Sequence, residues 1–182
     1  IWTDTISAHS YQQFVANFMD PHTDHKRLLI KWDTGTGKSY AAVMIAMIWI
    51  RMCRMQQINI TNPGSVWVLG FNSNVFKREL LRNPSFEFMS HQEYMKLLEY
   101  SAAAKHGRES DEQRYQEYMM KIRRRLTNRK HGGFFRFMGY KEFANWIDTL
   151  DDEAIKKEFG NSLMICDEIH NLSLIHISEP TR

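Results

Sequence analysis

The stretch LLIKWDTGTGKS, residues 28–39, decides the fold of this chain. Its first five residues are mostly apolar, which predicts a short buried strand over residues 28–32. A loop with Gly35 and Gly37 follows, and then residues 39–55, which are rich in Ala, Met and Ile on nearly every face. Such a segment is typical of a helix buried against a sheet. A strand, a glycine loop and a helix in this order indicate a phosphate-binding loop, or P-loop.

The residue types of this loop suit a chain of phosphates. Glycines let main-chain N–H groups wrap around phosphate oxygens, a lysine neutralises the terminal phosphates, and a hydroxyl can hold Mg²⁺. The strict motif has a further Gly where this chain has Trp32, so the loop entrance is altered while the cradle is kept. A chance match of the same letters is the alternative. The candidate nucleotide-binding residues of the loop are Thr34, Gly35, Thr36, Gly37, Lys38 and Ser39.

A second motif, DEIH at residues 167–170, follows an apolar run that predicts a strand over residues 162–166. In P-loop enzymes an Asp at such a strand end holds Mg²⁺, and an adjacent Glu can polarise the attacking water. We expect this strand to lie beside the strand of the P-loop, so that Asp167 and Glu168 reach the phosphates. Taken alone, an acidic pair can simply begin a loop, and His170 can be a solvated loop residue.

Alternating strands and helices extend along most of the chain. Strands are predicted over residues 28–32, 66–70, 134–138 and 162–166. Helices are predicted over residues 10–19, 39–55, 90–100, 141–147 and 153–159, and over a segment with one apolar stripe formed by Tyr115, Tyr118, Met119, Ile122 and Leu126. This alternation predicts an α/β fold with a parallel sheet. Residues 90–129 form a helical insertion in it.

Composition bounds the class of protein. The chain has 182 residues, 43% of them hydrophobic and 13% aromatic, which is enough for a core and excludes a disordered tail. With 24 Lys and Arg against 21 Asp and Glu, the net charge is only +3, which excludes a histone-like tail. Cys53 and Cys166 are too few for a disulfide framework, which favours a reducing compartment. The longest apolar run, residues 41–50, is half a membrane span, and no signal peptide is visible.

Both ends of the sequence suggest a piece of a longer protein. The chain opens with Ile1 rather than Met. Residues 172–182, LSLIHISEPTR, match the translation of a sequencing-library adapter, and we expect them to be foreign to the protein. An irregular natural tail is the alternative. The domain expected from the sequence therefore covers residues 1–171.

GTGKS followed by DEIH resembles motifs I and II of the superfamily 2 helicases and translocases. Further segments resemble the helicase-type ATPases of nucleocytoplasmic large DNA viruses, a family that includes the poxvirus early transcription factor small subunit and nucleoside triphosphate phosphohydrolase I. These segments are YQQFVANFM, LLIKWDTGTGKS, VLGFNSNVFKRELL, RLTNRK with GFFRFMGYKEF, and NSLMICDEIHN. The resemblance covers most of residues 8–171, and it implies a RecA-like domain that is the N-terminal motor lobe of a two-lobe enzyme.

The resemblance also implies roles for individual residues. Lys38, Asp167, Glu168 and His170 would be catalytic, with ATP as cofactor and with Ser39 and Asp167 as Mg²⁺ ligands. Gln12 matches the glutamine that reads the adenine edge in such enzymes, since an amide can pair with N6 and N7. Gln13 is a rival for this role, and an exposed helix residue is the alternative for Gln12.

Two sets of residues suit a nucleic-acid backbone. Asn72, Ser73 and Asn74 match motif Ia, which touches nucleic acid in relatives, and a plain loop is the alternative reading. Gly139 and Tyr140 stand where relatives often carry Thr-Tyr. A basic cluster comprises Lys121, Arg123, Arg124, Arg125, Arg129 and Lys130. Such a cluster suits phosphate neutralisation. A solvated helix face balanced by nearby acidic residues is the alternative.

The sequence thus predicts a nucleic-acid-dependent ATPase of helicase type that acts in viral transcription. Its partners would be DNA or RNA and a viral RNA polymerase or second transcription factor subunit, in a virion or a cytoplasmic viral factory. One alternative is a double-stranded-DNA translocase, a chromatin-type remodeller motor or a restriction-type motor subunit with the same ATPase site. A promoter-binding subunit with ATPase activity and a P-loop kinase or nucleotide switch are the others. Without a second lobe, we expect residues 1–171 to bind nucleotide weakly and not to unwind duplexes.

Overall fold

The computed structural model describes residues 8–33, 35–55, 65–70, 73–82, 86, 88–105, 109–127 and 134–169. The helices are α1 (Ser10–Phe18), α2 (Lys38–Met55), α3 (Ser73–Arg82), α4 (His91–Lys105), α5 (Glu109–Thr127), α6 (Tyr140–Ile147) and α7 (Asp152–Phe159). The strands are β1 (Val66–Leu69), β2 (Phe135–Met138) and β3 (Leu163–Cys166). Within these residues no helix is long and apolar enough to cross a membrane.

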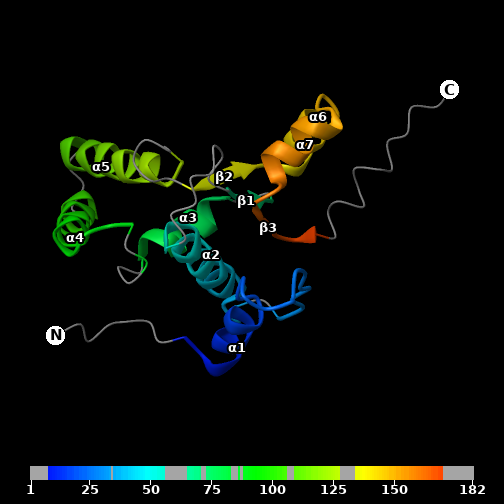
Figure 1. The fold of residues 1–182 in the computed structure, drawn as a ribbon. Helices are drawn as coiled ribbons and strands as arrows, with labels where there is room; N and C mark the ends of the chain where they lie inside the picture. The colour runs from blue at the N-terminus through cyan, green and yellow to red at the C-terminus, as the bar shows by residue number, and fades with distance from the viewer. Residues whose placement is uncertain are drawn as a thin grey trace.

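The strands form a parallel sheet with β1 in the middle, in the order β2-β1-β3 (Figure 1). Val66 lies opposite Phe135 on one side and opposite Leu163 on the other. All four residues of β1 are buried, as expected for a central strand of a parallel sheet, which is covered on both faces. The parallel α/β fold predicted from the alternating sequence pattern is confirmed.

Helices cover the two faces of the sheet. Val66 and Val68 pack into one core cluster with residues of α2, α3 and α5, such as Ile50, Leu80 and Leu126. Because side chains alternate along a strand, Trp67 points to the opposite face. There its ring packs against aromatic rings of α6 and α7, namely Phe143, Trp146 and Phe159. The result is a three-layer arrangement of helix, sheet and helix.

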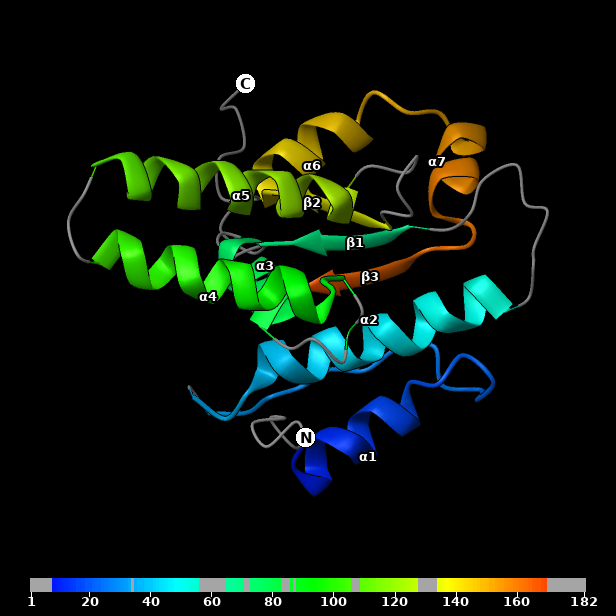
Figure 2. The same ribbon diagram turned by 90° about the vertical axis from the view of Figure 1, so that its left-hand side faces the viewer.

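The predicted helical insertion is an antiparallel pair of helices, α4 and α5, that lie side by side (Figure 2). Ser90 caps α4 as its sequence predicts: its hydroxyl accepts from the Glu93 N–H at 3.2 Å, and the Glu93 carboxylate accepts from the Ser90 N–H at 3.0 Å. Met119, Ile122 and Leu126 of the predicted stripe are buried. The hairpin is therefore attached to the core through one face of α5.

Two predictions about local structure are wrong. Residues 28–32 are not a strand, and Leu29 is 76% exposed. The neighbour of β3 in the described sheet is β1, so the acidic motif does not follow a strand that pairs with residues 28–32. The alternative interpretation of residues 72–74 as a plain loop fails at residues 73–74, because they begin α3, a helix that was not predicted from the sequence. Its signal was present in Phe76 and Leu80, two buried residues at helical spacing.

Candidate nucleotide-binding site

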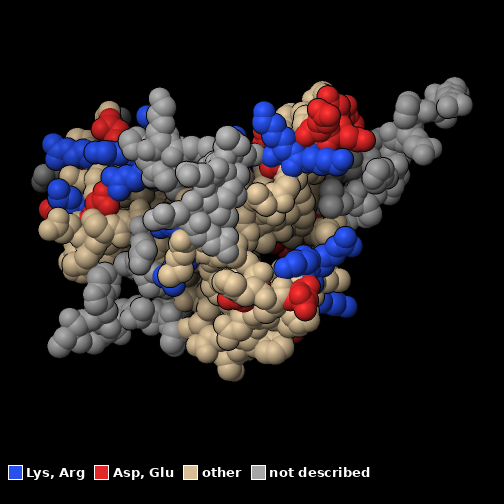
Figure 3. Space-filling model, in the orientation of Figure 1, with Lys and Arg blue, Asp and Glu red and all other residues tan. Residues whose placement is uncertain are grey.

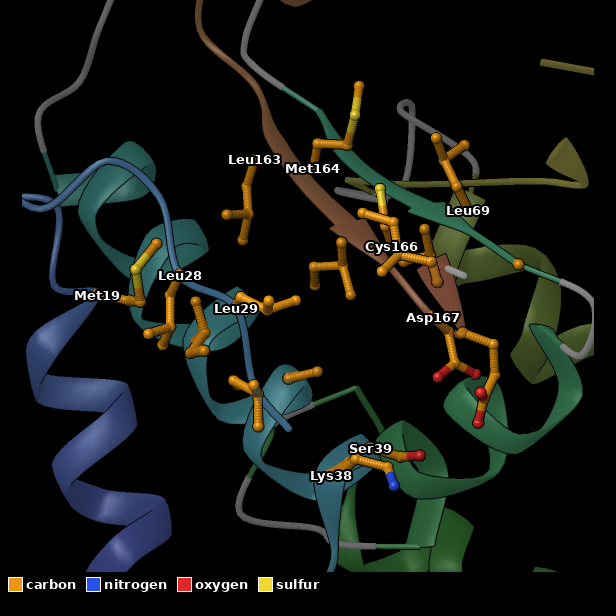
Figure 4. Close-up of a pocket in the computed structure, with 18 of the residues that line it drawn as sticks. Met19, Leu28, Leu29, Lys38, Ser39, Leu69, Leu163, Met164, Cys166 and Asp167 are labelled. Carbon is orange, nitrogen blue, oxygen red and sulfur yellow. The ribbon is translucent and has the colours of Figure 1, made fainter. Parts of the chain in front are cut away.

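The two predicted motifs meet at one cavity of about 870 Å³. One wall is the segment 26–32, and the facing wall is β3 with the residues that follow it. Lys38 and Ser39 line the cavity from the start of α2, and Asp167 and Glu168 line it from the end of β3. Figure 4 shows the Asp167 side chain directed toward the end of α2 that carries Lys38 and Ser39. The structure thus brings the lysine, hydroxyl and carboxylates of the two motifs together, although segment 26–32 and β3 do not pair.

The glycine loop has the conformation that its sequence requires. Gly35 and Gly37 have φ angles of 85° and 81°, in the left-handed region that glycine adopts without strain. Between them, Thr36 is tied to Asp33, whose carbonyl accepts from the Thr36 hydroxyl at 2.7 Å. The loop therefore turns sharply in front of α2, which places the positive end of that helix toward the cavity.

Lys38 is held by the entrance of its own loop. Its Nζ donates to the carbonyls of Trp32, at 2.7 Å, and Asp33, at 3.3 Å. The Trp32 ring packs edge-on against the ring of Tyr11, with centroids 4.9 Å apart. The position that carries Gly in the strict motif thus uses its main-chain carbonyl toward Lys38 and its side chain toward α1. This agrees with an altered entrance and an intact loop.

Helix α1 is fastened to the loop by two consecutive side chains. The Tyr11 hydroxyl donates to the Thr36 carbonyl at 3.0 Å, and the Gln12 side-chain amide donates to the Gly37 carbonyl at 3.2 Å. Gln12 is only 4% exposed, and its other amide atom accepts from the His9 N–H at 2.9 Å. The alternative of an exposed helix glutamine is therefore wrong, whereas its rival Gln13 is exposed. Adenine recognition by Gln12 stays a prediction.

The acidic pair sits on a turn that is fixed by its neighbours. The Asp167 N–H donates to the Leu69 carbonyl at 2.9 Å, which continues the pairing of β3 with β1. A side chain at Gly70 would come within 3.1 Å of the Asp167 Cβ, so glycine leaves room for Asp167. The carbonyl of Asp167 accepts a hydrogen bond from the Tyr140 hydroxyl at 2.6 Å. Sequence reasoning missed this contact and that of Tyr11, because neither follows from local spacing.

The donor set fits a nucleotide with Mg²⁺. A glycine loop at the start of a helix offers main-chain N–H groups to phosphates, and Lys38 adds a positive charge. The Ser39 hydroxyl and Asp167 carboxylate are oxygen ligands of the kind that Mg²⁺ prefers, together with phosphate oxygens and water. In the described part of the chain, no group of three His, Cys, Asp or Glu could hold a metal ion by itself. Ser39 and Asp167 therefore fit a Mg²⁺ ion whose other ligands are phosphate oxygens and water.

The predicted nucleic-acid residues are spread over α3 and α5. Arg123 and Arg124 are exposed on α5, whereas Arg125 makes an ion pair of 2.6 Å with Glu93 of α4. Figure 3 shows the basic side chains over α5 interspersed with acidic ones. Asn74 is exposed in the first turn of α3. Arg125 therefore links α5 to α4 through its ion pair. Arg123 and Arg124 stay candidates for phosphate contact.

Several predictions fall outside the described residues. They concern Thr34, Asn72, Arg129, Lys130, His170 and the tail at residues 172–182, together with the side chain of Ser73.

A parallel α/β sheet, a glycine loop that begins α2 and an acidic pair at the end of β3 together define a nucleotide-binding domain of the P-loop class. The chain belongs to the family described as "Type III restriction enzyme, res subunit", whose family model matches residues 5–177. This is a helicase-type family, which confirms the fold class predicted from the sequence. No solved structure matches the chain at a significant level.

The chain is also similar to viral proteins. It is 38% identical over 158 residues to the "Early transcription factor large subunit homolog" of African swine fever virus, isolate Tick/Malawi/Lil 20-1/1983. The homologues from isolates Tick/South Africa/Pretoriuskop Pr4/1996 and Warthog/Namibia/Wart80/1980 are equally similar. Each match covers 85% of this chain and 14% of the relative. The resemblance to helicase-type proteins of large DNA viruses is thereby confirmed, and the chain spans a small part of those relatives.

Proposed function

We propose that this chain is the ATP-binding lobe of a helicase-type ATPase that acts in the transcription of a large DNA virus. One observation carries the proposal: Lys38, Ser39, Asp167 and Glu168, from two motifs far apart in sequence, line the same cavity. Membership of a helicase-type family and the viral relatives support the same reading. By the same relatives, the protein would work in a virion or a cytoplasmic viral factory.

The reaction would be phosphoryl transfer from ATP to water. Gly35, Gly37 and Lys38 bind the β and γ phosphates, and Lys38 exchanges its bonds to the Trp32 and Asp33 carbonyls for phosphate oxygens. Mg²⁺, when bound, supplies positive charge that offsets the charge developing on the phosphates.

The remaining steps belong to side chains at the end of β3 and the start of α2. The Ser39 hydroxyl and the Asp167 carboxylate would hold the metal ion. The Glu168 carboxylate would orient the attacking water and accept its proton as the water oxygen bonds to the γ phosphorus, while the bond to the β-phosphate oxygen breaks and ADP leaves. His170, which follows Glu168 closely in sequence, would couple this site to the nucleic-acid side.

Replacement of Lys38 tests the proposal. In the full-length protein, Lys38→Ala removes the charge that stabilises the phosphates, so we expect ATP turnover to disappear while the circular dichroism spectrum is retained. Lys96→Ala, at an exposed position of α4 away from the cavity, is the matched control and should keep the original rate. Unchanged turnover in Lys38→Ala would refute the assignment.

The chain alone should be a much weaker enzyme. In two-lobe motors, ATP lies between the lobes, and the second lobe supplies an arginine finger that contributes a factor of about 10³ to 10⁵ in related phosphoryl transfers. We therefore expect the isolated chain to bind nucleotide weakly and not to separate duplexes. Robust unwinding by it would contradict this expectation.

Nucleic acid is the proposed partner of the exposed face of α5. Arg123→Ala and Arg124→Ala should each weaken binding to any sequence and reduce the dependence of log affinity on log salt by about one unit. Arg114→Ala, near the other end of α5, is the control. Equal losses in all three variants would show that the effect is only one of net charge.

A promoter-binding transcription factor subunit is the second candidate, because the viral relatives bear the name of a transcription factor subunit. Competition between promoter and scrambled duplexes at fixed salt separates the two functions. A factor that recognises promoters prefers its own site by about 10³-fold or more. A motor that binds DNA through its backbone shows little preference. A double-stranded-DNA translocase would differ only in moving along duplexes without separating them.

A further inference from the structure

Tyr140 links the far side of the sheet to the acidic motif. It is the first residue of α6, directly after β2 and Gly139, and it is 2% exposed. Its hydroxyl donates to the main-chain carbonyl of Asp167 at 2.6 Å. Since β1 lies between β2 and β3, this bond passes across the end of the central strand. A buried tyrosine thus contacts the peptide that joins the two acidic residues.

The bond completes a set of ties at one edge of the sheet. The Gly70 N–H donates to the Met138 carbonyl at 3.2 Å, and the Asp167 N–H donates to the Leu69 carbonyl at 2.9 Å. These two main-chain bonds fix the ends of β1, β2 and β3 relative to one another. They leave the Asp167 carbonyl to be oriented, and the Tyr140 hydroxyl holds it.

The orientation of this carbonyl matters because of Glu168. Glu168 has a φ of 55° and is the one residue other than glycine with a positive φ in the described part of the chain. Residues with a side chain rarely adopt this conformation, and it persists when the surrounding structure enforces it. The plane of the peptide between Asp167 and Glu168 sets this angle, and the Asp167 carbonyl belongs to that peptide.

We propose that Tyr140 is a positioning residue for Glu168: its hydroxyl fixes the Asp167 carbonyl, and so the direction in which the Glu168 carboxylate meets the attacking water. The inference rests on the proposed ATPase function.

Tyr140→Phe in the full-length protein removes the hydroxyl and keeps the ring. We expect kcat for ATP hydrolysis to fall by about 10-fold to 100-fold, as for a misplaced catalytic group. The KM for ATP and the thermal midpoint should change no more than in Tyr94→Phe, a half-buried tyrosine of α4 that serves as the matched control. A kcat equal to that of the control would overturn the inference.

Measuring Tyr140→Phe in a second background, the Glu168→Gln variant, distinguishes a positioning role for Tyr140 from a merely structural one. If Tyr140 acts through Glu168, then Tyr140→Phe lowers the rate in the wild type but not in Glu168→Gln, measured in single turnover. The same fold-loss in both backgrounds would contradict the proposal. Two isosteres cover the case in which Tyr140→Phe folds poorly. 4-Aminophenylalanine at position 140 keeps a donor and should retain most of kcat, whereas 4-methylphenylalanine should not, and equal rates would also contradict the proposal.

Failure of this inference differs from failure of the proposed function. If Lys38→Ala abolishes turnover and Tyr140→Phe does not alter it, only the role of Tyr140 is lost. If Lys38→Ala leaves turnover intact, the ATPase assignment is lost, and with it the reaction that Tyr140 would serve.

Discussion

The side chain of Gln12 lies against Gly37 so closely that its amide occupies the place a Cβ would need at position 37. The same amide donates to the Gly37 carbonyl at 3.2 Å. A helix near the start of the chain therefore limits what the phosphate-binding loop can contain. Gly35 has nearly the same φ, but nothing lies within 4 Å of a Cβ placed there.

The two glycines make a matched pair of substitutions. Gly35→Ala and Gly37→Ala both force a side chain into the left-handed region, at a cost of about 1–2 kcal/mol. Gly37→Ala in addition displaces Gln12 and breaks its bond to the loop. We expect it to lower the thermal midpoint and the affinity for a fluorescent ATP analogue more than Gly35→Ala does. Equal effects of the two variants would mean that the contact with Gln12 is unimportant.

The ion pair between Glu93 and Arg125 should make the α4–α5 hairpin sensitive to acid. The hydrogen bond from Arg125 lowers the pKa of Glu93 to about 2, from an ordinary value of 4.5. Because the folded pKa is the lower one, the pair stabilises the protein fully above about pH 4.5 and less as pH falls toward 2.

Arg125→Ala measures this contribution. We expect it to lower the free energy of unfolding by about 0.5–1 kcal/mol at pH 7, since the pair is partly exposed. The difference from the wild type should shrink between pH 4.5 and pH 3 in denaturant titrations. Arg124→Ala, whose guanidinium donates to the Met120 sulfur at 3.7 Å, is the control. A difference independent of pH would argue against the pair.

Alkylation of the two cysteines should report nucleotide binding. Burial raises the pKa of both the Cys53 and the Cys166 thiol, so both should react slowly with iodoacetamide at pH 7 and faster as pH rises. Cys166 lines the cavity and Cys53 does not. Mass spectrometry of labelled peptides should therefore show that ATP with Mg²⁺ protects Cys166 and leaves Cys53 unchanged. Equal protection of both would indicate a general tightening of the fold instead.

Trp67 should tolerate one substitution and not another. Its side chain is buried among aromatic rings, and its indole Nε1 has no hydrogen-bond partner among the described residues. Trp67→Ala leaves a cavity and should cost about 3–5 kcal/mol. Trp67→Phe loses less volume and also removes the unsatisfied N–H, so we expect a cost near 1 kcal/mol in urea unfolding. A large cost for Trp67→Phe would show that the N–H is satisfied in solution.

Much of this architecture follows from local patterns. The loop from Gly35 to Ser39, the strand before Asp167 and the cap of Ser90 on Glu93 depend on residues close together in sequence. These three features can therefore be predicted from the sequence without knowledge of the fold. Motif knowledge also predicts that Lys38 and Asp167 belong to one site, because each type of residue has a defined task toward phosphate and metal.

Local patterns did not show that residues 28–32 would stay outside the sheet. An apolar run shows that a segment favours burial, but it does not show which surface is available to it. Here Trp32 packs against Tyr11, and a cavity separates Leu28 and Leu29 from β3. The contact between Tyr140 and Asp167 was not predictable for the same reason. It joins the start of α6, which follows β2, to the end of β3, and β1 lies between these two strands.

The central place of β1 in the sheet has a consequence for how the chain is made. Both partners of β1 come later in the sequence: β2 follows the whole α4–α5 hairpin, and β3 follows α6 and α7. During synthesis on the ribosome, this apolar strand therefore emerges well before the two strands that pair with it in the described sheet. The α4–α5 hairpin is formed by contacts close in sequence and can fold in the meantime, whereas β1 is made before the strands that cover its two edges, and unpaired strand edges of this kind favour aggregation.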